Sequence, residues 1–376
     1  ICLVINYKAY KTELDPNNVQ KTLLMKSAGV ARFAYNWGLY QKKLAMDVRG
    51  KIPSCMDLHK RLVSLKETEF PWMYEVSKWA PQEALRNLDK AFDNFFRKCK
   101  LKKQGKFKGK VGFPQPKKKS KKIGSFYLNG QIKVMTNKIQ LPRIGKVSLK
   151  EHGYIPTEGK ILSATVSEKA GRWYVSVLIE AELSDPPKKP ELIIGLDLGI
   201  KTLATCSDGE VFESPRALKK NLKKVKKLGR QLSKKKNGSN NRKRAAKKLA
   251  KLHAKVANIR KDNHHKITTQ LTKTKSMIVI EDLNVSGMMK NHKLAQAISD
   301  VGFYEFRRQL QYKGKLYGCQ ILVADQFYPS SKTCSQCGNI KSNLTLKDRV
   351  YHCESCNLEI DRDLNAAINL EQYFTV

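Results

Sequence analysis

An aspartate inside an unusually apolar segment is the first feature of the sequence that could do chemistry. Residues 192–200 read Leu-Ile-Ile-Gly-Leu-Asp-Leu-Gly-Ile, and Asp197 is the charged residue among them. A run this apolar is typical of a strand that is buried on both faces of a sheet, where an unpaired carboxylate costs several kcal/mol. A metal ion is the natural partner of such a carboxylate.

Two later stretches carry further acids. A second apolar strand pattern ends in Glu281 and Asp282, and Asp361 and Asp363 open a helical pattern. Three acids supplied by a strand, a strand and a helix are what a pair of Mg²⁺ ions at a phosphodiester requires. Spacing alone leaves open the alternative that each acid is a strand-end charge or an ion-pair partner.

The order of the acids along the chain limits the choice of fold. Asp, Glu, Asp along the chain, with the first acid on a strand that returns as a hairpin through Asp208-Gly209, suits an RNase H-like fold. Such folds hold two metal ions ~3.5 to 4 Å apart, one activating water and the other stabilising the leaving oxygen. The sequence therefore predicts two Mg²⁺ ions in one catalytic site.

Four cysteines have the spacing of a zinc ribbon, Cys334-x2-Cys337-x15-Cys353-x2-Cys356. Each Cys-x-x-Cys supplies two of four tetrahedral thiolates, so the zinc is structural and His352 is a neighbour. Scattered single cysteines indicate a reducing compartment, and we expect a cytoplasmic protein. These singles are Cys2, Cys55, Cys99, Cys206 and Cys319.

The net charge predicts a nucleic-acid partner. The 376 residues hold 73 Lys+Arg against 33 Asp+Glu, a net charge of +40. Solubility in a small domain needs a magnitude of only about 2 to 8. A solvated basic surface is the alternative. Residues 97–122 hold 13 Lys or Arg and residues 216–261 hold 20, with no acid in either stretch, so both are expected to contact phosphates.

Other functional classes lack their motifs. The sequence has no GxGxxG, Walker loop, GxSxG or HExxH, and no apolar run approaches the ~20 residues of a membrane span. His264 and His265 are expected to pack or to contact phosphate rather than to act as bases. The residues expected to bind nucleic acid are Arg32, Lys201, Lys223, Lys227, Arg230, Arg242, Arg244 and Lys332.

Periodicity predicts the elements that position these residues. Alternating strands in residues 1–15 and 123–187 predict a small β-barrel, interrupted by a helical domain over 16–122 that ends in a mobile basic loop. A Pro-rich linker at 186–190 marks a domain boundary. Nuclease segments at 191–327 and 358–376 follow, containing a basic helical hairpin at 216–261 and interrupted by the zinc insertion at 328–357.

Six motifs, in order along the chain, resemble those of TnpB, the transposon-encoded RNA-guided endonucleases similar to the ancestors of type V CRISPR effectors. They are Tyr-Lys-Ala-Tyr-Lys at 7–11, Gly-Val-Ala-Arg-Phe-Ala-Tyr-Asn at 29–36, Gly-Leu-Asp-Leu-Gly at 195–199, Ile-Glu-Asp-Leu at 280–283, Ser-Ser-Lys-Thr-Cys-Ser-Gln-Cys-Gly at 330–338 and Asp-Arg-Asp-Leu-Asn-Ala-Ala-Ile-Asn at 361–369.

The resemblance implies an α/β multidomain protein. Its parts would be a wedge-like β-barrel, a helical recognition domain and a RuvC-like nuclease with a zinc-ribbon insertion. The catalytic acids would be Asp197, Glu281 and Asp363. A guide RNA from the transposon end would direct cutting of double-stranded DNA beside a short flanking motif. Two departures from the family pattern are Asp15-Pro16 in the opening run and Asn357 in place of a glycine after Cys356.

Other functions stay open. A nuclease-inactive RNA-guided DNA-binding repressor of the same family has no use for three intact acids, which disfavours it. An RNase H-fold DNA transposase typically orders its acids Asp, Asp, Glu. A plain RNA-binding zinc protein is a more distant alternative. We expect no membrane association and favour a monomer.

Overall fold

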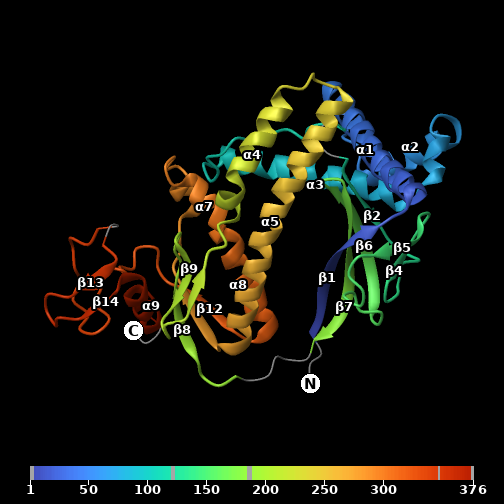
Figure 1. The fold of residues 1–376 in the computed structure, drawn as a ribbon. Coiled ribbons are helices and arrows are strands. Elements are labelled where there is room, and N and C mark those ends of the chain that lie inside the picture. The colour runs from blue at the N-terminus through green and yellow to red at the C-terminus, as the bar shows by residue number, and fades with distance from the viewer. Residues whose placement is uncertain (1–3, 120–122, 184–188, 346–347, 374–376) are drawn as a thin grey trace. The chain divides into compact units, whose positions relative to one another are not determined.

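The computed structural model describes residues 4–119, 123–183, 189–345 and 348–373 (Figure 1). The chain divides into two compact units, residues 1–183 and 184–376. The predicted Pro-rich linker at 186–190 begins shortly after this break, and its residues 186–188 lie outside the described part of the chain.

A seven-stranded antiparallel sheet forms the centre of the first unit. Its strand order is β2-β6-β7-β1-β5-β4-β3, and alternate residues of β7, such as Val175 and Val177, are buried in its core as period-2 patterning requires. Among the described strands, β2 and β3 end this order without pairing to each other, so closure into a barrel remains a prediction. The strands are β1 (Val4–Asp15), β2 (Ser125–Leu128), β3 (Lys133–Val134), β4 (Lys138–Leu141), β5 (Gly145–Leu149), β6 (Lys160–Lys169) and β7 (Arg172–Leu183).

Helices lie between β1 and β2 in the chain, as the interrupted pattern predicted. They are α1 (Asn18–Asp47), α2 (Cys55–Thr68), the 3-10 helix η1 (Pro71–Glu75) and α3 (Trp79–Lys103). A capping box between Asn17 and Gln20 begins α1. Gly38 lets α1 lie close to α3, since a Cβ there would come within 2.7 Å of Leu85.

The basic loop of this unit is more ordered than predicted. Residues 97–103 are the last turns of α3. Further along, the Asn36 side chain accepts a hydrogen bond from the Lys117 backbone N–H (2.8 Å) and donates one to the Lys117 carbonyl (3.0 Å). The Lys117 ammonium lies 4.0 Å from the centre of the Tyr35 ring. These contacts hold Lys117 to α1. The expectation of a loop is wrong for residues 97–103, which are helical, and the mobility of the rest stays a prediction.

The second unit contains a five-stranded sheet of order β10-β9-β8-β11-β12. Strands β8, β9 and β10 form antiparallel hairpins, and β11 and β12 add in parallel on the other side of β8. The antiparallel pairing of β8 with β9 confirms the predicted hairpin return of the strand that carries Asp197. The strands are β8 (Ile193–Asp197), β9 (Thr202–Cys206), β10 (Val211–Glu213), β11 (Met277–Ile280) and β12 (Gln320–Val323).

Six helices complete the described part of this unit: α4 (Ala217–Ser233), α5 (Asn240–Thr274), α6 (Val285–Met288), α7 (Ala295–Val301), α8 (Phe303–Tyr317) and α9 (Arg362–Gln372). The predicted basic hairpin is α4 with α5, but α5 continues 13 residues beyond the expected end at 261 because Ile267 and Leu271 join the core. Buried Asp300 of α7 accepts hydrogen bonds from the Leu218 and Lys219 N–H groups and so fixes the start of α4.

Two features of this unit place the predicted acids and cysteines. A Cβ at Gly195 of β8 would lie 1.8 Å from the Ala367 carbonyl oxygen, so only glycine lets α9 lie against this strand. The cysteine-bearing segment between β12 and α9 contains the short antiparallel strands β13 (Val350–His352) and β14 (Glu359–Asp361). Over the described residues, no helix is both long and apolar enough to cross a membrane.

Candidate active site

The three predicted acids lie in one region at one end of the second unit's sheet, although their carboxylate oxygens do not all lie within 4.8 Å of one another. Asp197 is the last residue of β8, and Glu281 follows the last residue of β11. The two strands are parallel, with Leu196 opposite Ile280, so their carboxyl ends meet at the same edge. Asp363 lies in the first turn of α9, which packs on β8 over Gly195.

The charge balance at this edge is negative. Burial, the Glu281 carboxylate and the Asp363 carboxylate, in that order, raise the pKa of Asp197 well above its ordinary value. The Arg362 guanidinium and the Leu198 backbone N–H oppose this shift. One guanidinium beside three carboxylates leaves charge that a hard divalent cation would neutralise, so the donor set fits Mg²⁺.

The neighbouring acids are occupied elsewhere. Asp282 forms an ion pair with Arg307 of α8. Asp361 is the N-cap of α9, and its Oδ1 accepts hydrogen bonds from the Asp363 N–H (2.9 Å) and the Leu364 N–H (3.1 Å). Asp363 accepts a 3.1 Å hydrogen bond from the Arg362 guanidinium, and the charge of its carboxylate raises the pKa of Asp197. The geometry therefore favours Asp363 over Asp361 as the third acid.

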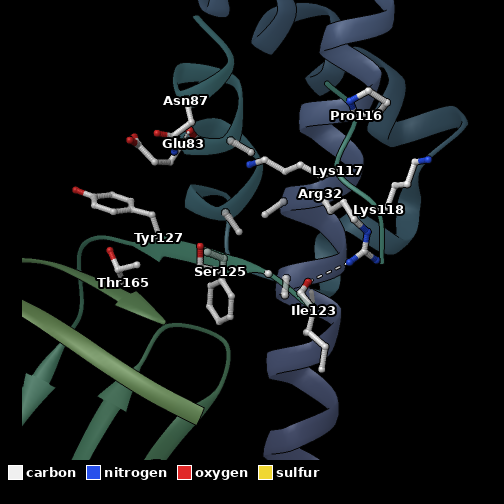
Figure 2. A pocket seen from close by; sticks show the side chains of 16 residues that line it. Arg32, Glu83, Asn87, Pro116, Lys117, Lys118, Ile123, Ser125, Tyr127 and Thr165 are labelled. Atoms are coloured by element: carbon white, nitrogen blue, oxygen red, sulfur yellow. Dashed lines mark hydrogen bonds between the residues drawn. The ribbon is translucent and has the colours of Figure 1, made fainter. Parts of the chain in front are cut away.

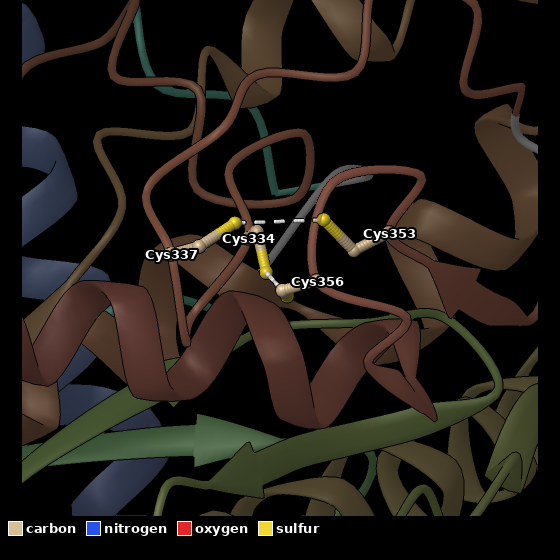
Figure 3. Close-up of side chains that lie close together, drawn as sticks. All are labelled: Cys334, Cys337, Cys353 and Cys356. Carbon is tan, nitrogen blue, oxygen red and sulfur yellow. Dashed lines mark hydrogen bonds between the residues drawn. The ribbon is translucent and has the colours of Figure 1, made fainter.

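The four predicted cysteines form one cluster (Figure 3). All four sulfur atoms lie within 4.8 Å of one another. The Cys334 and Cys356 sulfurs are 3.5 Å apart, as are those of Cys337 and Cys353. Four sulfur ligands at this separation fit a closed tetrahedral zinc site. The cluster has its own small core around fully buried Tyr351, and His352 is not part of the sulfur cluster.

The two cysteine turns share one geometry, which explains the departure noted in the sequence. Gly338 (φ 75°) and Asn357 (φ 59°) both adopt left-handed conformations directly after the second cysteine of their pair. The N–H of each donates to the carbonyl of the first cysteine, at 2.9 Å for Cys334 and 3.0 Å for Cys353. Asparagine tolerates this region better than most residues other than glycine, so Asn357 preserves the turn.

Several residues that complete this region were missed by sequence reasoning. Ser330 donates its hydroxyl hydrogen bond to Glu281, and Arg362 contacts Asp363. Asn365 and Asn369 of α9 bond to the cysteine-bearing segment. Their spacing of four, which places both on one helix face, is the signal that could have revealed a shared partner.

Some of the residues predicted to contact nucleic acid are exposed, and others make hydrogen bonds within the protein. Lys223, Lys227 and Arg230 are exposed on α4 and line a hollow of about 430 Å³ together with Lys226, Gln231 and Lys234. Arg242 is half-buried, and its Nη1 donates to the Leu232 and Lys235 carbonyls at 3.0 Å, closing the turn between α4 and α5. Its clearest role is therefore structural.

The remaining predicted contacts are more dispersed. Arg244 and Lys201 are exposed, and the Lys201 carbonyl accepts from Arg216. Exposed Lys332 donates to the Ser342 carbonyl at 3.1 Å within the cysteine-bearing segment. Arg32 belongs to the first unit, where its Nη1 donates to the Ile123 carbonyl at 3.1 Å.

Arg32 lines a pocket of about 660 Å³ in the first unit (Figure 2). The pocket is bounded by α1, α3, the end of the basic loop and strand β2. Its charged groups are the cations of Arg32, Lys117 and Lys118 and the carboxylate of Glu83. Neutral side chains that both donate and accept hydrogen bonds also line it, namely Asn87, Tyr127 and Thr165.

Comparison with family models gives three matches along the chain. Residues 164–292 match a model described as "Probable transposase" (OrfB_IS605). Residues 303–370 match "Cas12f1-like, TNB domain", and residues 6–51 match a helix-turn-helix domain of the OrfB_IS605 type. The second match includes all four cysteines and Asp363.

Two curated relatives are similar over nearly the whole chain. "Putative RNA-guided DNA endonuclease InsQ" of Escherichia coli (strain K12) is 33% identical over 380 residues, 96% of this chain and 91% of the relative. "Putative RNA-guided DNA endonuclease" of Streptomyces pristinaespiralis is 33% identical over 366 residues, 96% and 88% of the two chains. A solved structure, described as "Structure of the mini-RNA-guided endonuclease CRISPR-Cas_phi3", shares the fold with a TM-score of 0.51 and 9% identity, covering 99% of this chain and 93% of that one.

Proposed function

Because the chain belongs to the TnpB family of RNA-guided DNA endonucleases, we propose that it cuts double-stranded DNA selected by a guide RNA, through two-metal phosphodiester hydrolysis. The observation that supports the nuclease is that Asp197 and Glu281 stand at the ends of adjacent parallel strands, and that α9, which carries Asp363, packs on the same strand as Asp197.

Each acid has a distinct structural basis for its role. Asp197 at the end of β8, Glu281 directly after β11 and Asp363 in the first turn of α9 would hold the cations. The Arg362 guanidinium would keep Asp363 in place before a cation binds. Bound Mg²⁺ would supply an activated water and stabilise the leaving oxygen.

The basic surfaces would hold the nucleic acids. A guide RNA derived from the transposon end would contact the α4–α5 hairpin through Lys223, Lys227 and Arg230. These side chains are exposed, and residues 214–261 contain no acid that would repel phosphates. Base pairing would select the target sequence. Zinc bound by the four cysteines would be structural.

The pocket in the first unit is a candidate reader of the DNA that flanks the target. Its cations suit phosphate oxygens, and Asn87 and Tyr127 supply the mixed donors and acceptors that base edges require. Substitution of Asn87 should relax the preference for the flanking motif, whereas loss of Lys118 should weaken binding uniformly.

The alternatives are less well supported. A binding protein without nuclease activity would not need a cluster of three acids, and this chain retains Asp197, Glu281 and Asp363. A transposase is disfavoured by the acid order and by the names of the two relatives. The monomeric state stays a prediction, to be measured by light scattering on the purified complex.

Alanine substitution of Asp197, Glu281 or Asp363 tests the proposal. Each should reduce cutting of a guide-matched duplex in Mg²⁺ by roughly a thousandfold or more, because the ions act together. Guide and target binding, followed by gel shift, should be retained.

Asp282→Ala is the matched control, since Asp282 adjoins Glu281 but pairs with Arg307. It should retain most of the cutting. Normal cutting by all three acid variants would refute the nuclease. Loss of cutting in Asp282→Ala with normal cutting in Glu281→Ala would show that the second ligand is misassigned.

A further inference from the structure

The cysteine cluster and the acid site are joined by a short chain of buried side chains. Ser330 stands at the start of the segment that leads into Cys334, and 2% of its surface is exposed. Its hydroxyl donates a hydrogen bond to Oε1 of Glu281. One carboxylate oxygen of Glu281 is thus held by a group outside the sheet that carries the acid.

Ser330 is itself fixed by α9. The Asn369 side-chain amide donates to the Ser330 carbonyl (2.7 Å) and to the Thr333 carbonyl (2.6 Å). One turn earlier, Asn365 donates to the same Thr333 carbonyl (2.7 Å) and accepts from the Ser335 N–H (3.0 Å). Both asparagines are almost fully buried, so these bonds are made away from water and are costly to break.

The residues that the asparagines hold are those beside the first cluster cysteine. Thr333 and Ser335 flank Cys334, so binding of the four sulfurs to one ion would fix the backbone that Asn365 and Asn369 engage. The same helix carries Asp363 two residues before Asn365. The positions of Glu281 and of the helix that carries Asp363 are therefore both fixed by hydrogen bonds to one turn of the cysteine-bearing segment.

We propose that the zinc ribbon positions the acid site, and that Ser330 is the positioning residue through which it holds Glu281. The inference rests on the proposed function. With Oε1 held by the Ser330 hydroxyl, the Glu281 carboxylate keeps one orientation in which its other oxygen can ligate a divalent cation. A ligand carboxylate that is held by an outer hydrogen bond binds metal about 10- to 100-fold better than one that is not.

The first experiment measures cation binding without nucleic acid. Mn²⁺ is titrated into the full-length chain freed of RNA, with free Mn²⁺ followed by its electron paramagnetic resonance signal and the Asp197→Ala protein defining background. Ser330→Ala should weaken the Asp197-dependent binding about 10- to 100-fold. Ser330→Thr, which keeps the hydroxyl, should bind within a few-fold of the unchanged protein.

Ser331→Ala is the matched control, because it removes a hydroxyl from the next residue of the same segment. It should leave Mn²⁺ binding unchanged. Zinc content and circular dichroism verify that each variant keeps the ribbon and the fold. Equal Mn²⁺ affinity in Ser330→Ala and Ser331→Ala would overturn the proposal, as would equal losses in Ser330→Ala and Ser330→Thr.

A double-mutant cycle separates positioning from general destabilisation. If Ser330 acts through Glu281, then Ser330→Ala should cost no further Mn²⁺ affinity in a Glu281→Gln background. An undiminished further loss there would show that Ser330 acts by another route and would overturn the proposal.

Cutting gives a separate answer. In the assembled complex, Ser330→Ala should raise the Mg²⁺ concentration needed for half-maximal cutting about 10-fold or more, with guide binding unchanged. If the unchanged complex does not cut, the proposed function fails, while Mn²⁺ binding still decides whether Ser330 positions Glu281. If it cuts and Ser330→Ala has the same Mg²⁺ requirement, the positioning proposal alone fails.

Discussion

Asp361 and Asp363 have different surroundings although they are two residues apart. The Asp361 carboxylate caps α9 by accepting two backbone hydrogen bonds, whereas the charge of the Asp363 carboxylate raises the pKa of Asp197. On a helix such residues point about 200° apart. Motif spacing alone does not assign the third acid, and the capping geometry supplies the missing physical distinction.

Asp361→Ala should therefore act on stability rather than on chemistry. Loss of the cap should lower the unfolding free energy by about 1 kcal/mol, measured by chemical denaturation. Asp361→Asn should restore most of it, because asparagine is an equally good cap. Both variants should keep substantial cutting activity. A well-folded Asp361→Ala protein as inactive as Asp363→Ala would assign a catalytic role to Asp361.

His264 makes the stability of the second unit depend on pH. The ring is fully buried, donates from Nε2 to the Val301 carbonyl (2.9 Å) and meets Phe306 edge-on. Burial lowers the pKa of His264 to about 4. The unfolded chain then binds more protons than the folded chain between pH ~6.5 and ~4, so the stabilisation present above pH ~6.5 is lost as pH falls through this window.

His264→Phe should flatten that part of the pH profile. The unchanged protein should lose on the order of 3 kcal/mol of unfolding free energy between pH ~6.5 and ~4 through this group, measured by urea denaturation at several pH values. His253→Phe, an exposed position on the same helix, is the control and should leave the profile as it is. Identical profiles for His264→Phe and the unchanged protein would refute the assignment.

At the scale of elements, the contact between β8 and α9 depends on one missing side chain. A Cβ at Gly195 would lie 1.8 Å from the Ala367 carbonyl oxygen and 2.5 Å from the Glu371 nitrogen. Both are backbone atoms, which cannot move aside as a flexible side chain can. Strand and helix would have to separate, and Asp363 would move with the helix.

Gly195→Ala should thus destabilise the second unit by roughly 3 kcal/mol or more and abolish cutting. The control is Gly229→Ala in α4, where an added Cβ meets nothing within 4 Å and should stabilise the helix by about 1 kcal/mol. Thermal denaturation compares the two. A Gly195→Ala protein as stable as the unchanged one would contradict the tight packing.

Zinc should be required for the structure of the cysteine-bearing segment. Binding of one zinc ion by four thiolates contributes on the order of 10 kcal/mol of folding energy in such modules. Treatment with a strong chelator should release one zinc per chain and remove hydrogen-exchange protection from residues 330–345 and 348–361, while β6 and β7 of the first unit keep theirs. Freshly purified protein without zinc would refute the assignment.

The sequence predicted the elements well where the physical signal is local. Buried strands such as β8 and β11, the helical hairpin and the cysteine turns follow from apolar runs, helical spacing and pair spacing. Contacts made across long sequence distances were not predictable. Asn36 held to Lys117, Ser330 held to Glu281 and Arg242 turned back onto the end of α4 depend on tertiary packing, which periodicity does not encode.

At the scale of the whole molecule, the +40 charge should appear as a steep salt dependence of RNA binding. Changing Lys223, Lys227 and Arg230 together to Gln should reduce the slope of log affinity against log salt by about two to three, roughly one for each phosphate contact. Affinities are measured by filter binding from low to high salt.

The control removes the same charge from lysines that already have acidic partners. Lys26, Lys150 and Lys266 pair with Glu75, Asp15 and Asp262 respectively, and their triple change to Gln should alter the slope much less. Equal reductions in both triple variants would mean that the affinity reflects net charge alone rather than contacts on α4.

The packing of α9 against Gly195 also sets an order of events during translation. Asp197 and Glu281 leave the ribosome well before α9, which follows every other described element in the chain. A nascent chain folds progressively from its N-terminal side. Until α9 has been synthesised, one face of β8 therefore stays exposed, and Asp197 and Glu281 lack the third acid. The nascent chain therefore cannot complete its acid site until the cysteine pairs and α9 have been made.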